Sequence, residues 1–227
     1  RFIIAGVAGM AGYNWFVNAG FELVPAGVGT LVTMIEPLMI AILAAMALGE
    51  KLTRYVLIGV VLAIAGSIVL FWPDLTSETQ HPISGRGLFY LLLCCIGWAI
   101  YIIVTKPLLD RHDSFTVTAV TMLIAAPIMI GAASEPLPQL AARLDMRQWF
   151  EVAYLVIASG LGGTMLWNYG AKHLSSTAAG TFLYLIPVIA VAAGALVLGE
   201  SVSVADISAL FLILIAMAVV LTPNFKF

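Results

Sequence analysis

The stretch Glu36-Pro37-Leu38-Met39-Ile40-Ala41-Ile42-Leu43-Ala44-Ala45-Met46-Ala47-Leu48-Gly49-Glu50 is an apolar run that contains a carboxylate beside a proline and ends in Gly-Glu. The same features recur 150 residues later, where Pro187 matches Pro37 and Leu198-Gly199-Glu200 matches Leu48-Gly49-Glu50. At this offset, without a gap, further identities pair Gly12 with Gly162, Asn18 with Asn168, Gly20 with Gly170, Ala45 with Ala195 and Pro73 with Pro223. Identities held in one register over about 60 residues predict an internal duplication.

The composition is that of a protein whose solvent is lipid. Hydrophobic residues make up 62% of the chain and charged residues 10%, with a mean hydropathy of +1.08, whereas soluble domains carry about 25% charged residues. A net charge of −2 and a pI near 5.9 give no indication of a nucleic-acid partner. Because Cys94 and Cys95 are adjacent within an apolar run, they cannot close an ordinary disulfide, and we interpret them as small core residues.

Eight apolar segments approach the length of about 20 residues that a helix needs to cross a bilayer. They are residues 2–21, 27–48, 55–72, 87–105, 115–134, 149–170, 177–198 and 204–222. None alternates as a strand would, so the sequence predicts an all-α, polytopic membrane helix bundle.

The two longest connections, 73–86 and 135–148, contain the Pro, Ser, Gln and charged residues expected of loops. Within the second connection, two leucines flanked by arginines fit a short interfacial helix, and a plain solvated loop fits equally well. The residues concerned are Leu140, Leu144, Arg143 and Arg147.

The cations are distributed unevenly between the two sides of the predicted bundle. One side carries seven, namely Arg1, Lys51, Arg54, Lys106, Arg111, Lys172 and Lys226, and the other carries three, namely Arg86, Arg143 and Arg147. Because Lys and Arg concentrate on the cytoplasmic side, we expect both ends of the chain and Glu50 to be cytoplasmic and Glu200 to be outside. The two halves are then inverted relative to each other, which requires an odd number of spans in each half.

The count of spans differs between the two halves. Five spans run from segment 87–105 to the end, and three precede it. Shifting the start of the second half back by 150 residues places the start of the first half about 64 residues before Arg1, which is room for two more spans. We therefore expect ten spans in two inverted five-span repeats, with eight present here. Residues 1–73 form the remainder of the first repeat, 74–86 a linker loop and 87–227 the second repeat.

The paired Pro…Leu-Gly-Glu endings resemble those of the drug/metabolite transporter superfamily, specifically the EamA-type exporters. The sequence Gly97-Trp98-Ala99-Ile100-Tyr101…Lys106 is similar to that family's Trp-Gly/Ala…Lys pattern in the opening helix of a half. The resemblance covers the whole chain. It implies a location in the plasma membrane, which is the inner membrane in bacteria, and export of amino acids, other metabolites or toxic cations.

Glu36 is the only charged residue well away from the end of a predicted span. A charge at the bilayer centre costs roughly 3 kcal/mol, so burial favours the neutral form of this carboxyl group. Glu36 is a candidate for proton coupling and for binding a cationic group of a substrate. The alternative is a protonated carboxyl group that bonds to a neighbouring helix and has no role in transport.

Two prolines are expected to break their helices near the middle of the membrane. Pro37 removes a helix hydrogen bond and frees the carbonyl of Thr33. The second half contains the equivalent proline. In the second half, Pro187 frees the carbonyl of Leu183. Such breaks line cavities in transporters, although a simple packing kink is the alternative interpretation.

The two breaks are expected at the same depth, because the repeats are inverted. We predict one central substrate pocket lined by Thr33, Glu36, Trp98, Tyr101, Thr181 and Tyr184, with Asn14 and Trp167 near its edge. Aromatic walls with a few polar groups are typical of small-molecule sites. Asn18 and Asn168 are interpreted instead as hydrogen-bonding links between helices. Gly49-Glu50 and Gly199-Glu200 are interpreted as helix ends, with each Glu placed to cap the next helix.

Motifs for enzyme chemistry are missing from the sequence. No metal-ligand spacing, phosphate-binding loop or nucleophile motif is present, so we expect no cofactor and no enzymatic activity. The expected function is secondary-active export of small amphipathic, amino-acid-like metabolites by alternating access, with protons as the candidate coupling ion. Efflux of aromatic cationic drugs and a non-transporting membrane assembly subunit are the alternatives. The substrate, the direction of transport and the oligomeric state stay open.

Overall fold

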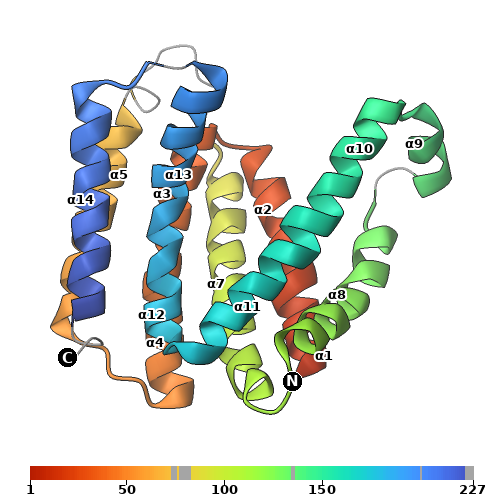
Figure 1. Cartoon of the computed structure of the whole chain (residues 1–227), viewed down its shortest axis with the longest axis horizontal. Coiled ribbons are helices and arrows are strands. Elements are labelled where there is room, and N and C mark those ends of the chain that lie inside the picture. The colour runs from red at the N-terminus through yellow and green to blue at the C-terminus, as the bar shows by residue number, and fades with distance from the viewer. Residues whose placement is uncertain (73–75, 77–82, 134–135, 200, 223–227) are drawn as a thin grey trace.

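The computed structural model describes residues 1–72, 76, 83–133, 136–199 and 201–222, and every regular element within these ranges is helical (Figure 1). The all-α prediction is therefore confirmed. Several residues used in the predictions lie outside the described residues: Pro73, Glu200, Pro223, Lys226 and most of the linker 74–86.

The first half of the chain forms three helical rods. The first rod consists of α1 (Phe2–Ile4), the π-helical segment η1 (Ala5–Gly12) and α2 (Tyr13–Phe21). The second consists of α3 (Ala26–Thr33) and α4 (Glu36–Leu48), and the third is α5 (Arg54–Leu70).

The second half begins with the long helix α7 (Gly85–Leu109), followed by α8 (Ser114–Gly131) and the short α9 (Leu137–Arg143). A long rod then combines α10 (Met146–Tyr154), the π-helical segment η2 (Leu155–Gly163) and α11 (Thr164–His173). The next rod combines α12 (Ser176–Thr181), the 3-10 segment η3 (Phe182–Tyr184), α13 (Leu185–Ala193) and the π-helical segment η4 (Gly194–Leu198). The last helix is α14 (Val204–Leu221).

Seven of the described rods are long and apolar enough to cross a membrane. The eighth predicted segment is also helical, but α5 has 17 residues, which is the lower limit for a spanning helix. The polytopic helical bundle is thus confirmed, and the count of eight spans stays a prediction. In the connection 135–148 a helix is observed, α9, which leaves Leu137 and Leu140 exposed.

Local capping explains where most helices of the second half begin. The side chain at the N-cap accepts a backbone N–H of the first turn in five helices, at Ser84, Asp113, Asp145, Ser175 and Ser203. Such caps typically contribute about 1 kcal/mol each. At the other end, Gly49 and Gly199 stop α4 and η4 with φ values of 71° and 69°, a left-handed conformation that glycine adopts without strain.

Helix α7 lies at the centre of the molecule and packs against α2, α4 and η1 (Figure 1). Glycine makes this close approach possible, because a Cβ atom at Gly9 would lie 2.6 Å from Cβ of Tyr101 on α7. Helices α5 and α14 pack along each other, where a Cβ atom at Gly66 would lie 2.9 Å from the carbonyl oxygen of Ala209. Small residues at such contacts are the usual basis of helix packing in membranes.

The helical elements recur at the 150-residue offset found in the sequence. The π-helical segments begin at Ala5 and Leu155, and the helices α5 and α14 begin at Arg54 and Val204. The members of each equivalent pair, α5 with α14 and α4 with α13, run in opposite directions in Figure 1. This is the relationship expected between equivalent helices of an inverted duplication, and the two inverted five-span repeats stay a prediction.

Candidate functional site

The second rod is interrupted at the residues that precede Glu36. Helix α3 ends at Thr33 and α4 begins at Glu36, with the N–H of Ile35 donating to the carbonyl of Val32 at 3.1 Å. Pro37 lies in the first turn of α4, where its missing N–H does not disturb the helix. The interruption falls within an apolar rod of 23 residues, and therefore sets a carboxylate at the start of a helix inside the protein.

The equivalent rod of the second half is interrupted at the equivalent place. Helix α12 ends at Thr181, the 3-10 turn η3 follows, and α13 begins at Leu185. Pro187 lies within the first turn of α13 and is buried. Each half therefore has one broken helix, and the two breaks differ in position by about the repeat offset.

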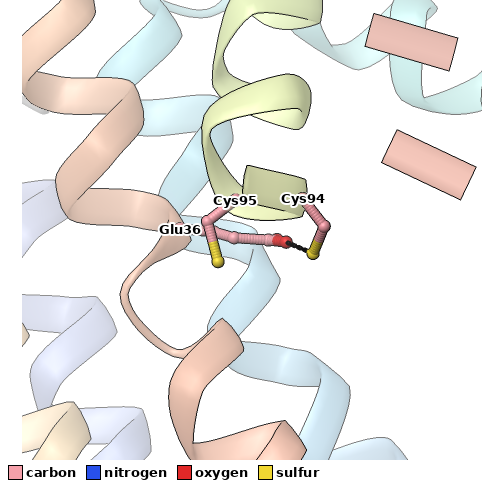
Figure 2. Close-up of side chains that lie close together, drawn as sticks. All are labelled: Glu36, Cys94 and Cys95. Atoms are coloured by element: carbon pink, nitrogen blue, oxygen red, sulfur yellow. Dashed lines mark hydrogen bonds between the residues drawn. The ribbon is translucent and has the colours of Figure 1, made fainter. Parts of the chain in front are cut away.

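Glu36 is 5% exposed and faces the paired cysteines of α7. The Cys94 Sγ atom lies 4.0 Å from Glu36 Oε1, and the Cys95 Sγ atom lies 3.8 Å from the carbonyl oxygen of Val32. Figure 2 shows the carboxyl group of Glu36 between the two sulfur atoms. The sequence interpretation of both cysteines as core residues is confirmed by their complete burial, but it missed their position around the buried carboxylate.

An aromatic cluster occupies the next turns of α7. The Trp98 ring is stacked on the Tyr101 ring, with centroids 5.2 Å apart and planes inclined by 13°. The rings of Trp167 and Tyr13 lie 5.7 and 5.0 Å from that of Trp98. Of the predicted pocket residues, the structure thus brings Trp98, Tyr101 and Trp167 into contact.

Asn168 anchors this cluster to α8. Its Nδ2 group donates to the Tyr101 hydroxyl at 2.7 Å and to the Thr118 hydroxyl at 2.9 Å. All three side chains are buried, and they belong to three different helices. The structure therefore confirms that Asn168 links helices. Its equivalent Asn18 donates to the carbonyl of Asn14, four residues earlier on its own helix.

Several buried polar atoms around the cluster have no hydrogen-bond partner within the described part of the chain. They include Nε1 of Trp98, Nε1 of Trp167 and Oδ1 of Asn168. Buried polar groups are almost always paired with protein, water or ligand. Two donors and one acceptor on adjoining side chains therefore offer polar contacts to a small molecule.

The remaining predicted pocket residues lie in adjoining regions. Tyr184 is buried in a second cluster with Met34 and Ile213. Thr181 and Thr33 direct their hydroxyl groups to carbonyls of their own helices.

Asn14 likewise bonds to the carbonyl of Met10 and lines a groove of about 220 Å³ with Trp15 and Asn18. A separate cavity of about 300 Å³ lies beside Trp167 and between α11 and α12, lined by Leu166, Trp167, Gly170, Ala171, Leu174, Ala179 and Phe182.

The loop after α4 makes a second polar site at one end of the bundle. The Glu50 carboxylate accepts the backbone N–H groups of Ser176 at 2.7 Å and Thr177 at 3.0 Å, and the Thr177 hydroxyl at 2.7 Å. Partial burial by itself would raise the pKa of Glu50, but the hydrogen bonds from Thr177 and Ser176 outweigh it and lower the pKa below its ordinary value.

These bonds show that the predicted target of the Glu50 cap was wrong. Glu50 was expected to cap the next helix, α5, but it caps α12, which lies 126 residues further along the chain. The N-terminus of α12 carries unsatisfied N–H groups that attract a carboxylate.

Lys106 binds the connection between α11 and α12, which immediately precedes the residues bound by Glu50. Its Nζ group donates to the carbonyls of Ala171, Lys172 and Leu174, at 2.8, 3.1 and 2.6 Å. A cation near the carbonyls that end a helix is stabilising. The connection between α11 and α12 is therefore fixed by an acid from the first half and a base from α7.

The fold is that of a multi-pass helical membrane protein with a few polar side chains buried in an apolar interior, and comparisons with known proteins identify its family. Residues 1–72 and 85–222 match the EamA-like transporter family. The chain belongs to this family and is a membrane transport protein.

Two relatives and one solved structure are similar to this chain at low sequence identity. An uncharacterised transporter of Archaeoglobus fulgidus is 24% identical over 215 residues, which cover 95% of this chain and 75% of that protein. A probable terminal-alkyne amino-acid exporter of Streptantibioticus cattleyicolor is 28% identical over 205 residues, which cover 87% of this chain and 64% of that protein. A solved crystal structure superposes with a TM-score of 0.78 at 24% identity, over 96% of this chain and 76% of the other. The chain therefore spans about two thirds to three quarters of the lengths of these proteins.

Proposed function

We propose that this protein is a secondary-active exporter of small amphipathic metabolites of the amino-acid type, and that it works by alternating access. The observation that carries the proposal is the buried Glu36 at a helix break. Its carboxyl group faces Cys94 on α7, one helical turn before an aromatic cluster with unpartnered polar groups. An isolated carboxylate is costly in a lipid environment and is characteristic of substrate or ion pathways.

The chemistry of this region matches a substrate with an amine and an apolar part. The Glu36 carboxylate suits an ammonium group, and the stacked rings of Trp98 and Tyr101 suit an apolar or aromatic side chain. The free Nε1 groups of Trp98 and Trp167 suit a carboxylate. The relative named as an amino-acid exporter supports the same substrate class. Thr33, Thr181, Tyr184 and Asn14 complete the proposed binding region from the adjoining helices.

The relationship between the halves supports the proposal of alternating access. We propose a topology of ten spans in two inverted five-span repeats, with residues 1–73 in the first repeat, 74–86 as linker and 87–227 in the second. Supporting this are the opposite directions of equivalent helices in Figure 1 and the breaks before Pro37 and Pro187. Inverted repeats allow the same contacts to form on either side of the membrane in turn.

Protons are the proposed coupling ion, because Glu36 is the one carboxyl group in the described part of the chain that is buried within a spanning rod. Protonation would neutralise Glu36 and release a cationic group, and loss of the proton would restore the attraction. The proposed location is the bacterial inner membrane with the C-terminus in the cytoplasm, as the seven-to-three distribution of cations indicates.

A second candidate function is efflux of aromatic cationic compounds. The specific observation in its favour is the cluster of Trp98, Tyr101, Trp167 and Tyr13 close to a single carboxylate, which is a favourable environment for an aromatic cation.

Transport by the native protein in liposomes distinguishes these functions. Vesicles with and without an imposed pH gradient are loaded with labelled amino acids or with aromatic cations, and the release of each is followed. The proposal expects proton-dependent release of amino acids. Release of aromatic cations alone would favour the second function, and no release of either class would contradict both.

A further inference from the structure

Glu36, Cys94 and Cys95 form a cluster of metal-ligand atoms inside the bundle. One carboxylate oxygen and the two sulfur atoms all lie within 4.8 Å of one another, and the three residues are 5%, 0% and 0% exposed. They come from two helices, α4 and α7, which the broken rod brings together (Figure 2). The chain contains two cysteines in total, and both are in this cluster.

The distances suit a cation of the size of zinc. Zinc binds thiolate sulfur at about 2.3 Å and carboxylate oxygen at about 2.0–2.2 Å, so two ligand atoms on one tetrahedral ion are roughly 3.5–4 Å apart. The Cys94 Sγ atom is already 4.0 Å from Glu36 Oε1. Small side-chain rotations would bring all three atoms to bonding distance from a common centre. The carbonyl oxygen of Val32 lies 3.8 Å from Cys95 Sγ and is a further oxygen atom near the cluster.

The charges suit a divalent cation. Metal ligands are thiolates rather than thiols, so a divalent ion bound by both sulfur atoms and the Glu36 carboxylate displaces their protons and leaves a complex with a net charge of −1, whereas the three ionised ligands without the ion would carry −3. The displaced protons pass to solvent. The second sulfur atom completes a set of two sulfur donors and one oxygen. Sulfur donors select zinc, cadmium and similar thiophilic ions over magnesium and calcium, which prefer oxygen.

We propose that Glu36, Cys94 and Cys95 bind one thiophilic divalent cation between α4 and α7. This site does not depend on the proposed transport function, because its occupancy is defined by direct binding to the protein. A bound ion would bridge the helix that contains the break at Met34–Ile35 to the central helix of the bundle.

Cadmium titration of the full chain in detergent tests the proposal. The protein is first treated with a chelator and a thiol reductant, and both are then removed. Cadmium bound to thiolate gives a charge-transfer absorption in the ultraviolet, which these two cysteines alone can generate in this chain. We expect this absorption to saturate at one cadmium per chain and to be unaffected by an excess of magnesium or calcium. No absorption, or saturation at a ratio unrelated to the chain, would overturn the proposal.

Substitutions test the contribution of each of the three proposed ligands to cadmium binding. The double substitution Cys94→Ala and Cys95→Ala should abolish the absorption, and each single Cys→Ser substitution should weaken cadmium binding. Glu36→Gln should weaken it at least tenfold while both thiols remain. The matched control is Glu151→Gln, which alters an exposed carboxylate in α10 and should leave cadmium affinity unchanged. Circular dichroism and gel filtration show that each variant is folded. A Glu36→Gln protein that binds cadmium as tightly as the native protein would overturn the three-ligand site. The outcome is independent of any transport assay, so failure of the transport proposal would leave it intact.

Discussion

The Glu50 carboxylate accepts two hydrogen bonds from Thr177, one from its backbone N–H at 3.0 Å and one from its hydroxyl at 2.7 Å, across a separation of 127 residues. The two residues belong to different halves of the chain, and the contact places an acid at the N-terminus of α12. Because a helix N-terminus attracts negative charge, this contact stabilises the packing of the two halves against each other at one end of the bundle.

Replacing Glu50 with Gln should destabilise the protein by about 1 kcal/mol, because the neutral amide is a weaker acceptor for the N–H groups of α12. The measurement is thermal unfolding in detergent at neutral pH. Glu151→Gln is the control, because its ion pair with Arg147 is exposed and such pairs contribute little. Equal unfolding temperatures for the native protein and Glu50→Gln would contradict a stabilising cap.

The same contact should make stability depend on pH. Hydrogen bonds hold the folded-state pKa of Glu50 below its unfolded value, so its contribution is fully present above the ordinary glutamate range near pH ~4 and is lost as the pH falls through the lowered pKa. We expect the difference in unfolding temperature between the native protein and Glu50→Gln to be constant near neutrality and to shrink in acid. A difference that grows in acid would have the wrong sign.

Replacing Lys106 with Met should also destabilise the protein, because Lys106 binds the connection between α11 and α12. Three carbonyls that now accept from the ammonium group would lose this donor, and charged hydrogen bonds typically contribute about 1.5–3 kcal/mol. Because Lys106 is only partly buried, we expect a loss of about 1–2 kcal/mol in unfolding free energy. Lys172→Met is the control, since its single contact with His112 is 3.4 Å long. A larger effect in the control would remove Lys106 from this role.

The orientation of the bundle leads to a labelling prediction. Lys51 and Arg86 are both exposed and are expected on the cytoplasmic and outer sides respectively. In a protein with Cys94 and Cys95 replaced by Ala, Lys51→Cys and Arg86→Cys should react with an impermeant thiol reagent from opposite sides of the membrane. Glu50→Cys and Glu200→Cys should likewise differ. Reaction of either pair from the same side would contradict the inverted arrangement.

Local signals in the sequence predicted most of the fold. Apolar length placed the spanning rods. Gly49 and Gly199 mark two of their ends, because glycine adopts the left-handed φ observed there without strain. The 150-residue register predicted which elements would correspond. The π-helical segments of η1 and η2 have no local signal of this kind, and the sequence did not reveal them.

The contacts that define the candidate site were harder to predict. Glu36 and Cys94 are 58 residues apart, and Glu50 and Thr177 are 127 apart, so no spacing rule connects either pair. The sequence isolated Glu36 because a charge within a span is costly, but its neighbours depend on how α4 packs against α7. Helical spacing predicted that Trp98 and Tyr101 share one face of α7, and their rings stack. That Tyr184 belongs to a second buried cluster depends on tertiary packing.

Replacing Trp98 with Ala should weaken substrate binding by about 1–3 kcal/mol if the ring contacts the substrate. Its stacking on Tyr101 and its unpartnered Nε1 group provide both an apolar face and a donor. The measurement is equilibrium binding of the transported compound to purified protein. Trp149→Ala is the matched control, because Trp149 is 45% exposed on α10 and lies outside both the aromatic cluster and the groove lined by Asn14. Equal losses in both variants would contradict a specific role for Trp98.

Replacing Glu36 with Gln should leave the fold intact and remove the proton dependence of transport. Gln has the size and hydrogen-bonding groups of a protonated Glu, so the packing of α4 against α7 is retained, but its side chain cannot ionise. We expect an unfolding temperature close to that of the native protein, together with a transport rate that no longer responds to an imposed pH gradient. Glu22→Gln, at the end of α2, is the control for a carboxylate outside the broken rod and should retain the native response. If the Glu36→Gln protein still responds to the gradient as the native protein does, another group carries the proton and Glu36 has at most a structural or metal-binding role.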